Sequence, residues 1–162
     1  MIYNQNLHQR RSIHLANYNY SKPGFYFVTI CTLQREDLFG RIIQNQMYLN
    51  QFGLTIRYHW QQLSEKFPQI KLGEFIIMPN HIHGIIEIVR TNRRQMLLPK
   101  IIGYLKMNTA KKINNIKNTP GNPVWQRNYY ERIIRDNNEY FNICDYIKNN
   151  PTNWTTDRNN KR

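Results

Sequence analysis

Acidic residues are scarce in this sequence. Only 10 of its 162 residues are Asp or Glu, against 23 Lys or Arg, which gives a formal net charge of +13 at pH 7. Such a surplus on a short chain favours a polyanionic partner, either nucleic acid or an anionic membrane surface. With 40% hydrophobic and 13% aromatic residues, the composition disfavours disorder. The length suits one domain with one modest core.

Long apolar runs and a cysteine framework are missing as well. No segment approaches the roughly 20 apolar residues of a membrane-spanning helix, and the opening MIYNQNLHQRR lacks the apolar core of a secretory signal. Cys31 and Cys144 form no CxxC or zinc-type pattern. Two buried free thiols in a reducing compartment are therefore the simpler interpretation. We expect a cytoplasmic protein that does not bind membranes.

The apolar pattern predicts one α+β domain. Aromatic and β-branched runs predict core strands over 24–32, 72–78, 81–89 and 124–130, the last extending in one alternative to 134. A hairpin is predicted over 41–49, and helices are predicted behind Asn50, over 98–116, and from Asn137 or Asn138 to Pro151. Without the hairpin and the last helix the order is βαββαβ, which predicts a ferredoxin-like, RRM-like antiparallel sheet with helices on one face. The other face is then left for a site.

Charge is distributed unevenly along the chain. Residues 90–162 hold 15 of the 23 basic residues but only 5 of the 10 acidic ones. We expect a basic N-terminal arm over 1–22, a single domain over 23–154 and a basic C-terminal tail over 155–162. No internal repeat or linker between domains is found.

His81 and His83 are the strongest local signal for a site. Residues i and i+2 of a strand point to the same face, so both imidazoles project together as a metal half-site or an acid/base pair. The alternative is a pair of hydrogen-bonded structural histidines. In the last predicted helix Tyr146 and Asn150 are four residues apart and share a face. The amide oxygen of Asn150 is a candidate neutral ligand for a metal ion. For Tyr146 the alternative interpretation is an ordinary tyrosine on a packed helix.

Four motifs in this order resemble those of the REP-associated tyrosine transposases, within the single-tyrosine HUH transposases of bacterial insertion sequences. They are PGFYFVT at 23–29, MPNHIHG at 78–84, VWQRNYYE at 124–131 and DYIKNNP at 145–151. The resemblance covers about residues 10–154, nearly the whole chain.

The resemblance implies an activity and a role for particular residues. His81 and His83 match the family's metal-binding histidine pair, and Tyr146 matches its nucleophilic tyrosine. Asn150 falls where the third metal ligand is expected, with Asn149 or water as substitutes because related enzymes carry a longer Gln there. The implied cofactor is Mg²⁺ or Mn²⁺. The implied reaction cleaves and rejoins single-stranded DNA through a 5′-phosphotyrosine, at palindromic repeats folded as hairpins, by a monomer or a homodimer.

The surplus of basic residues then has a role as DNA-binding surface, in contacts with phosphates that supply affinity but no sequence information. The predicted DNA-binding residues are Arg10, Arg11, Lys106, Lys111, Lys112, Lys117, Arg127, Arg132 and Arg135. Tyr129 or Trp125 are candidates to stack on unpaired bases. Ionising a phenol at pH 7 costs about 4 kcal/mol, and Lys148 and Lys112 are candidate sources of the positive charge that offsets it.

Three other functions compete with this one. A non-catalytic or domesticated nucleic-acid-binding module would use the same kind of sheet, although no RNP-type aromatic motif is found. A replication or mobilisation nickase would share the HUH chemistry without transposition. A zinc hydrolase for small molecules would leave the charge unexplained.

Overall fold

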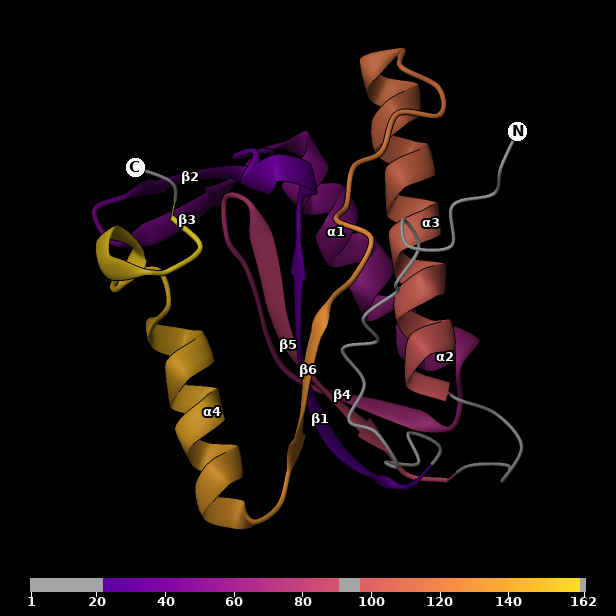
Figure 1. Ribbon diagram of the computed structural model, residues 1–162, viewed down its shortest axis with the longest axis vertical. Helices are drawn as coiled ribbons and strands as arrows, with labels where there is room; N and C mark the ends of the chain where they lie inside the picture. The colour runs from indigo at the N-terminus through magenta and orange to yellow at the C-terminus, as the bar shows by residue number, and fades with distance from the viewer. Residues whose placement is uncertain (1–21, 91–96, 161–162) are drawn as a thin grey trace, which may run out of the picture.

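The computed structural model describes residues 22–90 and 97–160 (Figure 1). Arg10, Arg11 and most of the basic loop expected at 90–97 lie outside the described residues. The elements, in chain order, are β1 (Gly24–Cys31), η2 (Leu33–Arg35), β2 (Gly40–Ile43), β3 (Gln46–Leu49), α1 (Gln51–Gln61), α2 (Leu63–Lys66), β4 (Ile70–Ile77), β5 (His81–Ile88), α3 (Leu97–Lys117), β6 (Tyr130–Ile134), α4 (Asn137–Asn149) and η3 (Trp154–Thr156).

Four strands form one sheet in the order β4-β5-β1-β6, and every neighbouring pair is antiparallel. With α1 and α3 as its helices, this is the βαββαβ arrangement, so the predicted ferredoxin-like fold is confirmed. In Figure 1 α1 and α3 lie on one side of the sheet and α4 lies on the other. The β2-β3 hairpin forms a separate two-stranded sheet.

Alternation along the strands separates the two faces of the sheet. Tyr26, Val28 and Ile30 of β1, all fully buried, belong to the core under α1 and α3. Phe27, between them, belongs to a smaller cluster that also contains Ile147 of α4. The same alternation in β5 directs its histidines toward the α4 face.

Local sequence signals explain where α1 begins and where the β2-β3 hairpin turns. The side chain of Asn50 caps α1 by accepting hydrogen bonds from the backbone N–H groups of Phe52 (2.9 Å) and Gly53 (3.1 Å), as predicted. Gln44 and Asn45 have φ values of 48° and 63°. Two consecutive residues in the left-handed region form a type I′ turn, whose twist matches that of the two strands of a β-hairpin.

Two predicted elements differ from the structure. The strand expected from Val124 begins only at Tyr130, and before it the chain is joined to the end of β1 by an isolated bridge between Thr32 and Trp125. Trp125 instead turns into the core, where its Nε1 donates to Thr109 Oγ1 at 2.9 Å. The last helix is capped by Asp136, because its carboxylate accepts from the N–H of Glu139 at 2.8 Å.

Both cysteines are free thiols, as predicted; Cys144 is buried and Cys31 is half-buried. No helix within the described parts of the chain has the length and apolar character needed to cross a membrane.

Candidate active site

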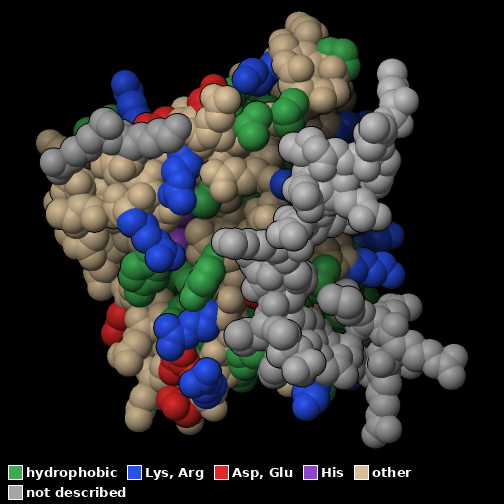
Figure 2. Space-filling model, viewed as in Figure 1, with side chains coloured by type: hydrophobic (Ala, Val, Ile, Leu, Met, Phe, Trp, Pro, Cys, Tyr) green, Lys and Arg blue, Asp and Glu red, His purple; other side chains and the backbone are tan. Residues whose placement is uncertain are grey.

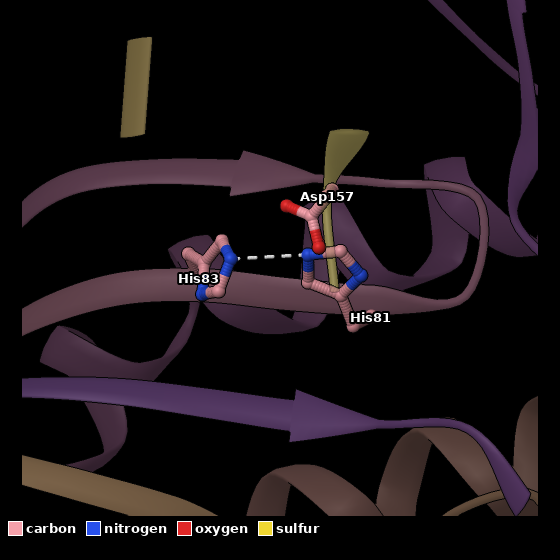
Figure 3. Close-up of side chains that lie close together, drawn as sticks. All are labelled: His81, His83 and Asp157. Carbon is pink, nitrogen blue, oxygen red and sulfur yellow. Dashed lines mark hydrogen bonds between the residues drawn. The ribbon is translucent and has the colours of Figure 1, made fainter. Parts of the chain in front are cut away.

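His81 and His83 are the first and third residues of β5, and their rings point toward each other (Figure 3). Both are fully buried, and their Nε2 atoms lie 3.0 Å apart. Two imidazole nitrogens come this close only when one donates a hydrogen bond to the other or when both bind one cation. The His-x-His spacing therefore produces convergent imidazoles, as expected.

The tautomer of His81 is set by Asn80. Asn80 Nδ2 donates to the carbonyl oxygens of Arg35 (3.2 Å) and Asn159 (2.9 Å). Its Oδ1 is thereby oriented toward His81 Nδ1, at 2.9 Å. Nδ1 then carries the proton, and the lone pair of Nε2 faces the site.

Thr29 and Phe27 of β1 hold His83 in place. Thr29 Oγ1 and His83 Nδ1 form a hydrogen bond of 2.8 Å, and the Phe27 ring stacks on the imidazole at 5.3 Å. Burial lowers the pKa of His81 to about 4, an effect that the Asp157 carboxylate opposes. Burial and the neighbouring His81 lower the pKa of His83 as well. Both rings are consequently neutral at pH 7, the form that binds metal ions.

Tyr146 of α4 points at this histidine pair from within the same chain. Its hydroxyl oxygen lies 3.3 Å from His83 Nε2, and its ring meets the edges of His83 and Phe27 at 5.2 and 6.1 Å. The side chain is 41% exposed. Burial raises the pKa of Tyr146, the Asp157 carboxylate adds to this, and Arg158 opposes it.

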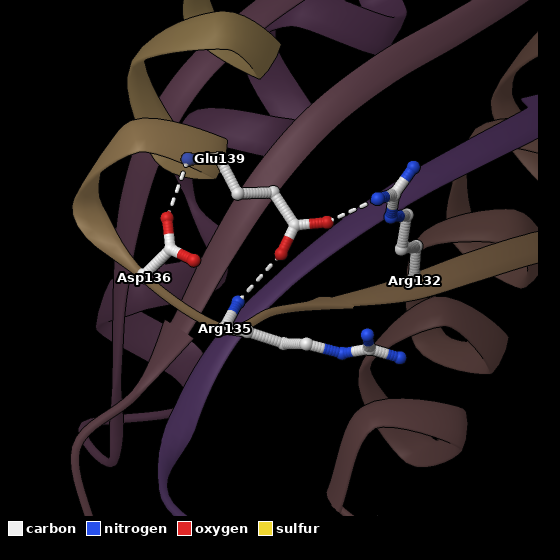
Figure 4. A network of polar contacts seen from close by, with 4 residues as sticks. All are labelled: Arg132, Arg135, Asp136 and Glu139. Carbon is white, nitrogen blue, oxygen red and sulfur yellow. Dashed lines mark hydrogen bonds and ion pairs between the residues drawn. The ribbon is translucent and has the colours of Figure 1, made fainter.

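Polar contacts at both ends of α4 fix the position of Tyr146. At the start of the helix, Glu139 accepts a hydrogen bond from the Arg135 N–H at 2.8 Å and pairs with the Arg132 guanidinium (Figure 4). Further along, Lys148 forms a 3.2 Å ion pair with Glu74 of β4. Lys148 therefore points away from the phenol, contrary to its predicted role.

Asp157 is a functional candidate that sequence reasoning missed. The segment after η3 returns to β5, and the carboxylate of Asp157 lies beside the His81 ring (Figure 3). One ligand atom from each of His81, His83 and Asp157 lies within 4.8 Å of the other two. A sequence signal did exist, since Asp157 is the single acidic residue after Asp145.

Asn150 lies against the same cluster, next to Asp157. It is 1% exposed, and its Nδ2 donates to Asp157 Oδ2 at 3.2 Å. Its Oδ1 is buried and has no hydrogen-bond partner among residues 22–90 and 97–160. Two neutral imidazoles, a carboxylate and an orphaned amide oxygen match the donor set of a divalent cation, so the residues present fit a metal.

Of the predicted DNA-binding residues that the structure describes, only Arg132 lines the cleft beside Tyr146. This cleft has a volume of about 610 Å³ and is also lined by Tyr130, Asn153 and Arg158. Figure 2 shows Lys and Arg side chains along the surface between α4 and β6. Arg127 and Arg135 are exposed outside this cleft.

The lysines of α3 lie on the opposite side of the sheet, because α3 packs on the other core. Lys111 and Lys117 are exposed, and Lys112 lines a groove with α1. Lys106 donates to the carbonyl oxygens of Gln126 (2.6 Å) and Arg127 (2.9 Å). Its ammonium therefore serves the fold rather than the surface.

Trp125, proposed to stack on bases, is only 7% exposed, whereas Tyr130 is 47% exposed and lies at the cleft. The Arg158 guanidinium sits 5.8 Å from the centre of the Tyr130 ring. Tyr130 is thus the aromatic side chain best exposed to a ligand at this site.

A ferredoxin-like sheet that carries a buried histidine pair opposite a helical tyrosine is the architecture implied by the sequence motifs. The chain belongs to the family described as "Transposase IS200 like", whose model matches residues 25–150. Two Haemophilus influenzae proteins are similar to it. One, described as uncharacterized, is 43% identical over 96% of both chains. The other, provisionally named a REP-associated tyrosine transposase, is 26% identical over 85% of this chain and 76% of its own.

Two solved structures share the fold. A REP-associated tyrosine transposase bound to a REP hairpin matches with a TM-score of 0.55 and 18% identity, over 82% of this chain and 69% of that one. A provisionally named transposase from Deinococcus radiodurans matches with a TM-score of 0.51 and 14% identity, over 82% of this chain and 95% of its own. The resemblance to REP-associated tyrosine transposases is thus confirmed.

Proposed function

We propose that this transposase is a metal-dependent nuclease and strand-transferase that acts on single-stranded DNA with Tyr146 as its nucleophile. The observation that carries the proposal is the 3.3 Å separation between the Tyr146 hydroxyl and His83 Nε2. A half-exposed phenol aimed at two buried imidazoles beside a cleft has the arrangement of a nucleophile at a metal site.

The proposed step is a transesterification. The Tyr146 oxygen attacks the scissile phosphorus, forming an O–P bond, while the bond from phosphorus to the 3′ oxygen of the preceding nucleotide breaks. The downstream DNA stays attached as a 5′-phosphotyrosine, and the leaving 3′ oxygen takes up the proton that the phenol gives up. Attack by another 3′-OH reverses the step and rejoins strands, because the covalent linkage retains the phosphodiester energy.

Local charge supports this step. Burial raises the pKa of Tyr146, so forming its phenolate at pH 7 costs more than the roughly 4 kcal/mol of an ordinary phenol. Nearby positive charge is needed to offset this cost. Arg132 and Arg158 line the cleft beside Tyr146 and can also contact the phosphate oxygens.

His81 and His83 would hold a divalent cation, Mg²⁺ or Mn²⁺, with Asn150 as the third ligand and the Asp157 carboxylate beside them. When bound, such an ion polarises the scissile phosphate and stabilises the leaving oxygen. Asn80 and Thr29 orient the two imidazoles from behind, which is the usual role of groups that contact metal-binding histidines.

Palindromic repeats folded as hairpins are the proposed substrate, and transposition in the cytoplasm is the proposed setting. The solved REP-associated tyrosine transposase is bound to a REP hairpin, and the formal charge of +13 suits a nucleic-acid ligand. Because Tyr146 reaches the histidines of its own chain, one copy is expected to suffice for cleavage.

The test uses single-stranded DNA in which a stable hairpin follows a randomised flank, labelled at its 3′ end, with Mn²⁺ or Mg²⁺. We expect a labelled band that migrates with the protein in a denaturing gel. Tyr146→Phe should abolish it, whereas Tyr58→Phe, a matched change on the exposed side of α1, should leave it unchanged. An undiminished adduct with Tyr146→Phe would falsify the nucleophile assignment, and an adduct formed in EDTA would contradict the metal.

A further inference from the structure

A second cavity adjoins the cleft that holds Tyr146. Its volume is about 390 Å³, within the range of small-molecule pockets. Tyr130 and Arg158 line both spaces, and the Arg158 guanidinium lies over the Tyr130 ring. Thr29, which holds His83, lines the floor. Whatever occupies this cavity lies one side chain away from the proposed scissile phosphate.

The chemistry of the lining is not that of a phosphate site. The cavity is lined by three amide side chains, two guanidinium groups, the Glu131 carboxylate and the Tyr130 ring. The amides are those of Gln126, Asn128 and Asn159, and the guanidinium groups are those of Arg35 and Arg158. Asn159 accepts a hydrogen bond from the Arg35 guanidinium, whereas within residues 22–90 and 97–160 neither Gln126 nor Asn128 has a side-chain hydrogen-bond partner. An amide offers a donor and an acceptor side by side, which matches the edge of a nucleobase. A phosphate, which only accepts hydrogen bonds, would be met by donors alone.

The backbone that carries these amides is held rigidly. The Gln126 N–H donates to the Cys31 carbonyl at the end of β1 at 2.9 Å. From the other side, Lys106 of α3 donates to the carbonyls of Gln126 and Arg127. A segment tied to a strand and to a helix presents its side chains with little loss of entropy on binding. The half-buried ammonium of Lys106 thus holds this segment in place.

We infer that this cavity is a nucleobase pocket that selects the base next to the scissile phosphate, read by Gln126 and Asn128. The inference rests on the proposed function, because the DNA strand passes the pocket only if it is cleaved at Tyr146. Unpaired bases splayed from the strand are the form in which single-stranded nucleic acid is read on its edges. Specificity at one position then comes from the protein, whatever the hairpin contributes elsewhere.

The experiment sequences the cleaved products. Wild-type protein and Mn²⁺ are mixed with the hairpin pool that has a randomised flank, and the covalent adduct and the released fragment are both sequenced. We expect one position bordering the cut to show a preference of about tenfold or more, the discrimination typical of a bidentate amide contact.

Two substitutions at Asn128 probe this preference. Asn128→Ala should flatten it at that single position, and Asn128→Asp, which removes the donors but keeps the shape, should change the preferred base. Preferences at other positions should stay unchanged, while adduct yield from the whole pool should fall, because DNA that carries the favoured base loses its contact. Asn115→Ala, an exposed amide on α3, is the matched control and should reproduce the wild-type profile.

Each outcome decides a different question. No adduct from the wild-type protein overturns the proposed function, and this pocket with it. Cleavage without preference beside the cut, or with a preference that neither Asn128 variant alters, overturns the pocket but leaves the nuclease. A loss of base preference that is equal at every position would show that Asn128 acts on the fold, and would also overturn the proposal that it reads a base.

Discussion

The two faces of the four-stranded sheet are built differently. Among the described residues, the face under α1 and α3 has a core of 22 buried hydrophobic residues, and the face under α4 has a cluster of 5. The second face buries polar groups instead, among them His81, His83 and Asn150. Buried polar groups cost free energy unless they are paired. The difference indicates that the first face stabilises the fold and the second is free to hold the site.

The largest expected effect is on the α4 face. His81→Ala should lower the yield of covalent adduct by about 10³-fold, equivalent to about 4 kcal/mol of transition-state free energy, because it removes one of the two imidazoles. Binding to a fluorescent hairpin, measured by anisotropy without divalent ions, should change by less than about threefold. A variant that loses binding and cleavage in parallel would assign His81 to the fold rather than to the chemistry.

The next effect should appear on the α3 face. A Cβ added at Gly84 would lie 2.3 Å from the Trp60 ring, which is 2% exposed and stacked on Phe75. Gly84→Ala should therefore destabilise the protein by about 3 kcal/mol, measured by urea unfolding. Gly103→Ala, in an open position of α3, should stabilise it by up to about 1 kcal/mol. Equal urea midpoints for the two variants would show that the core under α1 and α3 accommodates an added methyl group at position 84 without loss of stability.

The two helix caps give a matched comparison of the faces. Asp136→Ala and Asn50→Ala each remove the side chain that caps a helix, at a cost of about 1 kcal/mol. Asp136→Ala should also lower adduct formation several-fold, because α4 carries Tyr146, whereas Asn50→Ala should leave it unchanged. These are read by urea unfolding and by adduct yield under conditions where both variants are folded. A similar activity loss for both would argue that the faces are not independent.

The smallest effect concerns surface charge. Since Lys111 and Lys112 of α3 lie across the sheet from the cleft, changing both to Gln should leave the salt dependence of hairpin binding nearly unchanged. Changing Arg132 and Arg158 to Gln should reduce the slope of log affinity against log salt by about 0.7 for each lost contact with a single strand. Anisotropy titrations between low and physiological salt measure both. A large slope change in the lysine variant would place DNA on the α3 face.

Local patterns predicted much of the fold and the core of the site. The alternation around Ile82 predicts that His81 and His83 converge, and the four-residue spacing of Tyr146 and Asn150 predicts a shared helix face. The same alternation already implied that the histidines point away from the helices on which Ile82 packs. We nevertheless expected the α3 lysines beside the site, because periodicity alone does not say which face a helix covers.

Other features depended on contacts distant in sequence. Asp157 reaches His81 only because the chain turns back after η3, and no local pattern encodes that return. Trp125 is of a residue type that is common in strands, yet it donates a hydrogen bond to Thr109 of α3 instead of extending β6. Asp136, Asn137 and Asn138 are all good caps by residue type, and the contact with the Glu139 N–H selects the first.

The position of Tyr146 within its own chain's site has a consequence for reaction order. If Tyr146 is the nucleophile, as proposed, each copy retains one cut DNA end at a time, so cleavage should be first order in protein and insensitive to dilution. Moving a DNA segment with two ends then requires either two copies brought together by the DNA or two successive turnovers. Joining, unlike cutting, should therefore depend on how close the two hairpins lie on the same strand.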